Sequence, residues 1–372
     1  SISGSEEGAQ MKAKRSEMLT VALFCTFLGA VALGYLLLPK AAFSPLEKRN
    51  LADLPEASWS TLRSGDWGQG VETYMADHMP GRNFFVGLNA YFEYYTGRQA
   101  AKDIWVVEDR LVEAPVQADE GAIRRNMDAV NRFAQTLGQD TTLTIVPTAG
   151  WSTGKSGYPD ASVIPAIYAQ AGENLIPLDI TDAFQGRPEL FYRTDHHWNS
   201  AGAYEAYAAC MVHWGRQVLP KTYFQVTPVE NFRGSTYSRS GLWLTPGETL
   251  ELWQGSDRLT VTNGETQQPH DGVFYRERLE EADKYTVFLD GNHSLVRIHN
   301  PEGQGRLLVI RDSFSNSLGC FLAEAYAEVV LVDLRYYRQP VSQLAAQEPF
   351  DDILICYSLG NFLSDTNLVF LR

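Results

Sequence analysis

Two short segments, more than a hundred residues apart, carry residue types that together could perform acyl transfer. Residues 306–314 read RLLVIRDSF, an apolar run that ends in Asp312 and Ser313 and leads into a helix-compatible stretch. A strand-to-helix turn presents a serine hydroxyl at the carboxyl edge of a sheet, where the helix N-terminus stabilises developing negative charge. Ser313 is therefore a candidate nucleophile, although a serine at a helix start is by default an N-cap.

The second segment, residues 192–202, reads YRTDHHWNSAG and follows a predicted strand at 189–193. A serine attacks carbonyls poorly until a histidine accepts its proton and a carboxylate fixes the tautomer of that imidazole. In an extended loop, residues two apart point the same way, so Asp195 and His197 can meet while His196 points elsewhere. The predicted catalytic triad is therefore Ser313, His197 and Asp195.

Two other interpretations of this loop remain open. Asp195, His196 and His197 could be metal ligands, with His293 or His299 recruited from a distance, but adjacent histidines seldom close one coordination sphere. Alternatively, Asp195 caps the following helix and the histidines satisfy buried polar groups. The four cysteines form no C-x-x-C pair, so a structural zinc site is not favoured. We expect no metal and no cofactor.

The composition indicates a folded, acidic protein with one membrane anchor. A net charge of -14 argues against nucleic acid as a partner. Residues 18–39 carry no charge over a length sufficient to cross a bilayer, and they predict a transmembrane helix, with a cleaved signal as the alternative. Basic residues flank this stretch on both sides, so they do not decide its orientation.

The remaining chain divides into a stalk and a catalytic domain. Residues 1–10 lack an initiator Met and are interpreted as an expression remnant, 11–40 as a cytoplasmic tip and anchor, and 41–67 as a polar stalk. The domain at 68–372 opens with two helical pieces broken at Pro80, whose aromatic side chains could form core or a groove wall for sugars.

Alternating strands and helices predict an α/β fold with a mostly parallel sheet covered on both faces, a three-layer α/β/α arrangement. The predicted helix spans 121–138, and the predicted strands are 143–147, 175–180, 306–310, 328–334 and 352–357, the last three in β-α-β-β order. Short alternating runs at about 220–304 predict an antiparallel insertion.

The chain resembles the DHHW family, a part of the SGNH-hydrolase-like group similar to the bacterial alginate O-acetyltransferases. The motif Asp195-His196-His197-Trp198 carries this resemblance, together with EKRNLADLP at 47–55, DHMPGR at 77–82, DKYTVFLDGN at 283–292 and RDSF at 311–314. In the related acetyltransferases, an Asp and a His of an Asp-x-His-Trp motif work with a Ser. The resemblance implies the same triad here, with the Asp-His pair before the Ser, an order permuted relative to ordinary SGNH hydrolases.

Three further residues are candidates for substrate contact or the oxyanion hole. Arg311 stands where the broader group often has Gly, and its side chain could narrow the pocket or contact substrate. The Ser313 amide and the Gly291-Asn292 pair are candidate oxyanion donors, although Gly-Asn is also typical of a surface turn. Arg82, after Pro80, is interpreted as a salt-bridging structural residue.

The expected function is extracytoplasmic O-acyl transfer, most simply of acetyl, to a cell-envelope polysaccharide through an acyl-enzyme. An esterase or deacetylase would use the same triad with water as acceptor, and a non-catalytic polysaccharide-binding scaffold is the alternative outside catalysis. The sequence has no nucleotide-binding loop for an acyl-coenzyme A donor. We therefore expect a multi-pass membrane-bound O-acyltransferase to deliver the acyl group, with the anchor as its docking element.

Overall fold

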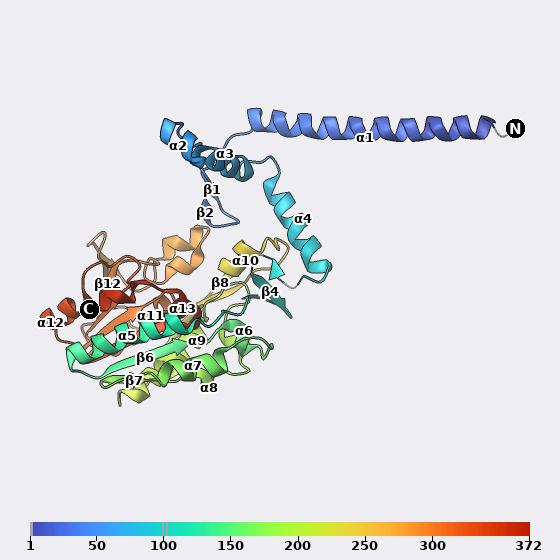
Figure 1. Cartoon of the computed structure of the whole chain (residues 1–372). Helices are drawn as coiled ribbons and strands as arrows, with labels where there is room; N and C mark the ends of the chain where they lie inside the picture. The colour runs from blue at the N-terminus through green and yellow to red at the C-terminus, as the bar shows by residue number, and fades with distance from the viewer. Residues whose placement is uncertain (1–2, 99, 102) are drawn as a thin grey trace. The chain divides into compact units, whose positions relative to one another are not determined.

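The computed structural model describes residues 3–98, 100–101 and 103–372, and part of the predicted remnant at 1–10 lies outside them. The chain forms two compact units, one up to Phe92 and one from Glu93 onward (Figure 1). All residues of the predicted triad belong to the second unit.

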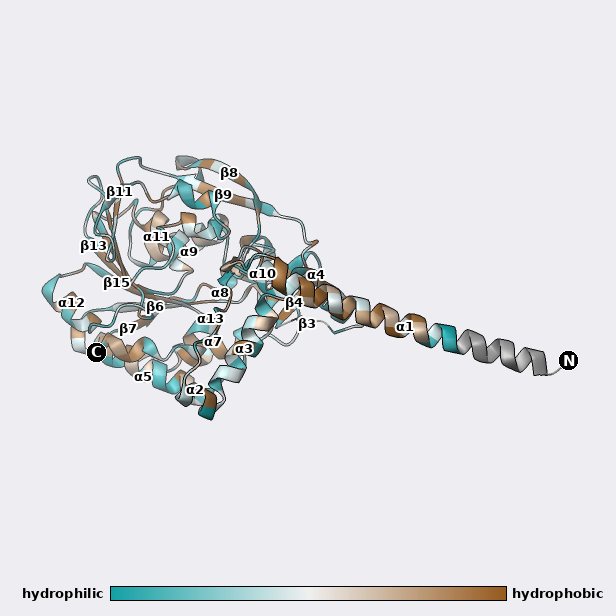
Figure 2. Ribbon diagram, turned by 90° about the horizontal axis from the view of Figure 1, so that it is seen from above, coloured by the Kyte–Doolittle hydropathy of each residue, from teal (hydrophilic) through white to brown (hydrophobic). Residues whose placement is uncertain are grey.

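The first unit begins with a long helix, α1 (Ser3–Leu37), and Figure 2 shows the part of it that leads into the rest of the unit as largely hydrophobic. Residues 14–37 of this helix have the length and composition to cross a membrane. The other elements are β1 (Phe43–Ser44), β2 (Arg49–Asn50), α2 (Trp59–Ser64), α3 (Asp66–Asp77) and α4 (Arg82–Tyr95). The predicted break at Pro80 is confirmed, because α3 ends before it and α4 begins after it.

Ion pairs hold the short segments of the first unit together. Arg49 Nη2 lies 2.5 Å from Asp77 Oδ1, and Arg82 Nη1 lies 3.0 Å from Glu47 Oε2. Arg82 also approaches Asp77 at 3.7 Å, so its predicted structural role is confirmed. The region expected to be a plain stalk therefore contains a small ordered structure.

The central sheet of the second unit has, among the described residues, eight strands in the order β11-β10-β12-β14-β13-β15-β6-β7. Its parallel part consists of β14 (Glu328–Val332), β13 (Arg306–Arg311), β15 (Asp352–Ser358), β6 (Thr141–Val146) and β7 (Leu175–Pro177). The predicted α/β fold with a mostly parallel sheet is confirmed.

Helices cover both faces of this sheet because alternate strand residues point in opposite directions. In β13, Leu307 and Val309 join the core beneath α9 (Ser200–His213) and α11 (Ser315–Leu322). Leu308 and Ile310 join the opposite core. The helices on that side are α5 (Glu120–Leu137), α7 (Asp160–Tyr168), α12 (Val341–Gln347) and α13 (Leu359–Ser364).

The predicted insertion is antiparallel, but its second half belongs to the central sheet. Strands β10 (Thr260–Asn263), β11 (Pro269–Asp271) and β12 (Leu295–His299) extend the edge beyond β14. The first half forms a separate hairpin of β8 (Gln225–Phe232) and β9 (Glu248–Gln254), with α10 (Ser235–Ser240) between them. A separate sheet holds β3 (Ala100–Ala101), β4 (Ile104–Val107) and β5 (Arg110–Glu113), and two short helices are α6 (Ala149–Ser152) and α8 (Thr181–Phe184).

Two local predictions were wrong. The run at 189–193 is not a strand: a 3-10 turn (Pro188–Leu190) ends there, and only an isolated bridge joins Phe191 to Trp198. A helix, α12, also separates β14 from β15, where β-α-β-β order was expected. Its seven residues contain few large apolar side chains, so they give a weak helical pattern.

Candidate active site

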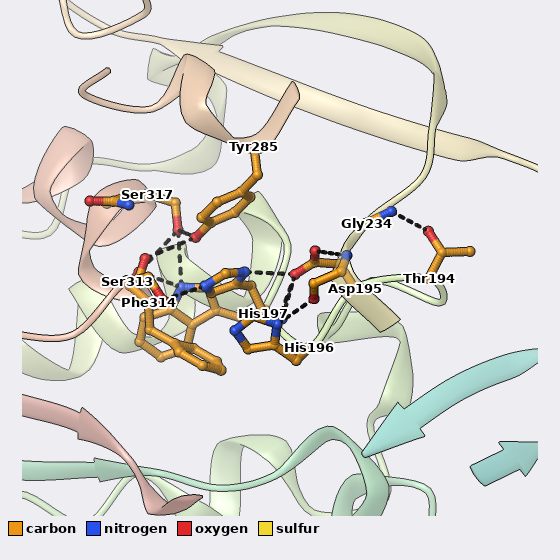
Figure 3. A network of polar contacts seen from close by, with 12 residues as sticks. Thr194, Asp195, His196, His197, Gly234, Tyr285, Ser313, Phe314 and Ser317 are labelled. Carbon is orange, nitrogen blue, oxygen red and sulfur yellow. Dashed lines mark hydrogen bonds and ion pairs between the residues drawn. The ribbon is translucent and has the colours of Figure 1, made fainter. Parts of the chain in front are cut away.

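Asp195, His197 and Ser313 form one continuous hydrogen-bonded chain (Figure 3). Asp195 Oδ1 lies 2.6 Å from His197 Nδ1, and His197 Nε2 lies 2.7 Å from Ser313 Oγ. All three side chains are buried. Because a carboxylate only accepts hydrogen bonds, Asp195 holds the proton on Nδ1 and leaves Nε2 to accept from the serine hydroxyl. This is the tautomer that a general base needs.

The loop that carries Asp195 and His197 is tied to the nucleophile turn by Trp198. Its indole Nε1 donates to Phe314 O and to Ser317 Oγ, both at 3.0 Å. The ring is fully buried. The tryptophan of the motif thus couples two segments that are distant in sequence, and it fixes the spacing between imidazole and hydroxyl.

The carboxylate of Asp195 is held from the other side by the start of α10. Ser235 N donates to Asp195 Oδ2 at 2.7 Å, and His197 N donates to Oδ1 at 2.9 Å. Gly234 packs so closely that a Cβ there would lie 2.1 Å from Asp195 Cβ. The site therefore requires a residue without a side chain beside the carboxylate (Figure 3).

Glu248 of β9 braces the residues just before Asp195, a role that the sequence did not reveal. Its carboxylate accepts from Arg193 N at 2.8 Å, Thr194 N at 2.7 Å and Thr194 Oγ1 at 2.5 Å. Burial raises the pKa of Glu248, and the hydrogen bonds from Thr194 and Arg193 oppose that rise. No motif marks this glutamate, because its partners are mostly backbone groups 54 and 55 residues away.

The nucleophile turn is built around the buried carboxylate of Asp312. Its Oδ2 accepts from Ser358 N, Ser358 Oγ and Asn361 Nδ2, each at 2.8 Å. The following helix begins at Ser315 with Phe314 as its N-cap, so Ser313 does not serve as the cap. Among the described residues, no hydrogen-bond acceptor contacts the Ser313 N–H.

Tyr285 covers the imidazole of His197. The two rings stack with centroids 4.0 Å apart and planes within 6° of parallel, and Tyr285 OH donates to Ser313 O at 3.3 Å. Burial raises the pKa of Tyr285 well above its ordinary value, so the phenol stays neutral. The ring thus fixes the plane of the imidazole and shields one of its faces from water.

The expectation that His196 points away from the Asp195–His197–Ser313 chain was wrong in part, because its Nδ1 lies 3.7 Å from Asp195 Oδ1. Its Nδ1 lies 2.5 Å from Ser235 Oγ, and its ring packs 3.8 Å from that of His197. Burial and the neighbouring His197 lower the pKa of His196. One ring of this pair therefore faces the serine, and the other lines a neighbouring cavity.

The metal interpretation has a suitable donor set, but two of its three members, Asp195 and His197, are engaged in hydrogen bonds. Ligand atoms of Asp195, His196 and His197 lie within 4.8 Å of one another. Both ring nitrogens of His197 and both oxygens of Asp195 already have hydrogen-bond partners. His293 bonds Asp290 and Glu265, outside this group. Metal binding would break the contact between His197 and either Ser313 or Asp195.

The three candidate substrate or oxyanion residues occupy different environments. Arg311, a candidate for substrate contact, has a fully buried side chain in this structure. Gly291 adopts φ 81° and donates its N–H to Phe288 O at 3.0 Å, so it is a turn residue whose amide is engaged. Asn292 is exposed, and its Oδ1 accepts from Arg311 Nη1 and Asn316 Nδ2.

A cavity of about 340 Å³ lies beside the candidate triad. His196 and Phe314 form part of its wall, which also contains polar side chains and short apolar ones. The lining also includes Glu113, Thr148, Ala149, Arg239, Ser358 and Asn361. The wall combines hydrogen-bonding groups with an ion pair between Arg239 and Glu113.

Comparison with known proteins finds similarity to the same family that the motifs resemble. Residues 167–332 match the family model described as DHHW protein. A DHHW family protein from Eubacterium siraeum is 20% identical with a TM-score of 0.62, over 72% of this chain and 93% of that one. Bacillus cereus PatB1 gives the same identity and score, over 72% of this chain and 98% of its own. No curated protein sequence matches.

At 20% identity the two structures establish a shared fold alone. The family model, in contrast, matches the amino-acid sequence. Its matched span contains all three residues of the hydrogen-bonded chain. The resemblance to the DHHW family that the motifs indicated is therefore confirmed over residues 167–332.

Proposed function

We propose that the chain is a serine O-acyltransferase that forms an acyl-enzyme on Ser313. His197 Nε2 takes the hydroxyl proton as Ser313 Oγ attacks the carbonyl carbon of an acyl donor, and the donor's leaving group takes that proton as its bond to the acyl carbon breaks. An acceptor hydroxyl then repeats the sequence and releases Ser313. The hydrogen-bonded chain from Asp195 to Ser313 is the observation that carries this proposal. The PatB1 structure, which shares the fold, carries a sulfonyl adduct, as an activated nucleophile would.

Two donors are available for the oxyanion of the tetrahedral intermediate. The Ser313 N–H has no acceptor among the described residues. Among the described residues, the side-chain amide of Asn292 forms hydrogen bonds only through Oδ1, so its Nδ2 is left to donate. Hydrogen-bond donors aimed at the developing charge contribute about 10²–10³ in rate each. We assign these two groups to the oxyanion hole, with Gly291 shaping the turn that presents Asn292.

The cavity lined by His196 and Phe314 is the proposed acceptor site. Ser358, Asn361 and Thr148 already donate to Asp312 or Asp160, and their side-chain oxygens can accept hydrogen bonds from sugar hydroxyls. The volume of about 340 Å³ suits one sugar unit. This favours a cell-envelope polysaccharide, most simply acetylated at a hydroxyl, as the acceptor. Water in the same place would make the protein an esterase.

The proposed fold assignment is an SGNH-hydrolase-like domain in which the Asp-His pair precedes the Ser. The proposed topology is a single-pass anchor at α1 with the second unit outside the cytoplasm. The acyl group then comes from a multi-pass membrane-bound O-acyltransferase, because one apolar helix cannot build a conduit through the bilayer.

Mass spectrometry of the intact, detergent-solubilised protein after exposure to an activated acetyl ester tests the function. A mass increase of one acetyl group, about 42 Da, is expected on the wild type and not on Ser313→Ala, since removal of a nucleophile costs several orders of magnitude in rate. Adding a polysaccharide acceptor should discharge the acyl-enzyme faster than water does. Turnover by Ser313→Ala within about tenfold of wild type would reject Ser313 as the nucleophile.

Co-purification tests the partner. The native protein is compared with one in which residues 18–39 are replaced by an unrelated apolar helix of equal length. Small side chains in α1 let a neighbouring helix approach closely. A Cβ added at Gly29 would meet no atom within 4 Å, whereas a Cβ added at Gly34 would meet Pro80 of the same unit. We expect only the native anchor to retain a multi-pass partner. Retention by both proteins would exclude the anchor as the docking element.

A further inference from the structure

Arg311, at the end of β13, is a buried cation next to the nucleophile turn. Its side chain has no exposed surface. Its polar contacts with the described residues all pass through Nη1, which lies 2.5 Å from Asn316 Oδ1, 3.3 Å from Asn292 Oδ1 and 3.9 Å from Asp333 Oδ2. Within the described chain, Nε and Nη2 have no hydrogen-bond partner. Burying a guanidinium with so few partners is costly, so a role other than stability is required to explain it.

The chemistry of the guanidinium fixes how both neighbouring amides are turned. Arginine only donates hydrogen bonds, so the Asn316 atom that faces Nη1 must be the oxygen. The Asn316 nitrogen then points the other way and donates to Asn292, whose facing atom is therefore also an oxygen, at 3.1 Å. Arg311 Nη1 contacts the same Asn292 oxygen directly.

We propose that Arg311 is a positioning residue that fixes the side-chain amide of Asn292 with its Nδ2 free to bind an acyl oxyanion. This inference rests on the proposed acyl transfer at Ser313 and extends it. Arg311 Nη1 and Asn316 Nδ2 both donate to Asn292 Oδ1. If the Asn292 amide were flipped, its Nδ2 would face these two donors and both hydrogen bonds would be lost. The buried charge therefore sets the direction of an exposed donor without touching substrate.

The surroundings of Arg311 allow its removal without orphaning a second charge. Its nearest carboxylate, Asp333, is already held by Arg335 through Nε at 2.9 Å and Nη2 at 2.6 Å. Arg311→Met consequently leaves Asp333 paired and replaces the cationic side chain with a shorter, unbranched apolar one. The Asn316–Asn292 pair remains, but nothing then prevents both amides from turning together.

A double-mutant cycle on the rate of acyl-enzyme formation tests the inference. Asn292→Ala removes the donor and should slow acylation about 100-fold. Arg311→Met should slow it about tenfold or more in the wild-type background and less than about twofold in the Asn292→Ala background, since it acts through that amide. Equal, additive effects in both backgrounds would show that Arg311 acts on stability or elsewhere in the site and would overturn the proposal.

A second variant guards against a folding defect. Asn316→Asp supplies a carboxylate that pairs with Arg311, so thermal unfolding should be unchanged or higher. The same change removes the donor to Asn292 Oδ1 and gives Asn292 Nδ2 a carboxylate to bind, which draws it away from the oxyanion. We expect acylation at least about tenfold slower with the fold intact. A wild-type rate would overturn the positioning role, whereas an active Ser313→Ala would instead reject the proposed function.

Discussion

Replacing Gly234 by alanine is expected to slow acyl transfer at least about 100-fold while most of the core is untouched. The added Cβ would lie 2.1 Å from Asp195 Cβ and 2.3 Å from Asp195 Oδ2. Non-bonded carbons normally stand about 3.5–4.0 Å apart, so the two segments must separate by roughly 1.4 Å or more. Gly234 has φ -92°, so the effect comes from the contact and not from backbone strain.

That displacement is large compared with the hydrogen bonds of the candidate site. The Ser235 N to Asp195 Oδ2 bond is 2.7 Å and the Asp195 to His197 bond is 2.6 Å, and either one lengthened by 1.4 Å is no longer a hydrogen bond. A misplacement of about 1 Å costs about 10²-fold, and complete loss of the correct histidine tautomer about 10⁴-fold.

The assay is the rate of acyl-enzyme formation on the intact protein, measured together with its thermal unfolding. Gly68→Ala in α3 is the matched control, because a Cβ there meets nothing within 4 Å. The control should acylate at the wild-type rate. If Gly234→Ala acylated within about threefold of the wild-type rate, with the control also active, the close packing of Gly234 against Asp195 would not be needed to position the carboxylate, and the prediction would be refuted.

Two further predictions concern the paired histidines and the first unit. His197→Ala should abolish acylation, because it deletes the base that contacts Ser313. His196→Ala should acylate within about tenfold of the wild-type rate and chiefly weaken the acceleration by the acceptor, because His196 lines the cavity. The reverse pattern would show that the two rings have the opposite roles. In the first unit, hydrogen bonding to Arg49 lowers the pKa of Asp77 to about 2 from 3.8. A carboxyl group whose pKa is lowered in the folded state stabilises the fold at pH values above its ordinary pKa. That stabilisation should fade as the pH falls from about 4 to about 2. The loss of stability can be followed by hydrogen exchange of the Ala52 amide, which donates to Asp77. Asp77→Asn should remove the pH dependence of this exchange. If the variant kept the pH dependence, a group other than Asp77 would cause it.

The sequence alone determined the features that follow from local periodicity. Apolar runs at β6, β13, β14 and β15 predicted the parallel strands, because a strand buried on both faces needs a continuous apolar segment. The two-residue spacing of Asp195 and His197 predicted that their side chains meet, and they do. The backbone at 193–197 is bent and not extended, however, and His197 N also donates to the Asp195 side chain. The uncharged stretch at 18–39 predicted the apolar helix α1.

The residues that hold the site together were decided by the tertiary structure. Glu248, Gly234 and Tyr285 all come from the segment expected to be an insertion, and each contacts the Asp195–His197 loop from 39 to 88 residues away in sequence. Such contacts leave no periodic signal, because a carboxylate facing backbone amides or a ring facing another ring has no preferred spacing along the chain. Arg311 shows the same limit: its position in RDSF suggested substrate contact, but burial among Asn292, Asn316 and Asp333 makes it an internal donor. Local sequence thus specified which groups could react, and long-range packing specified their orientation.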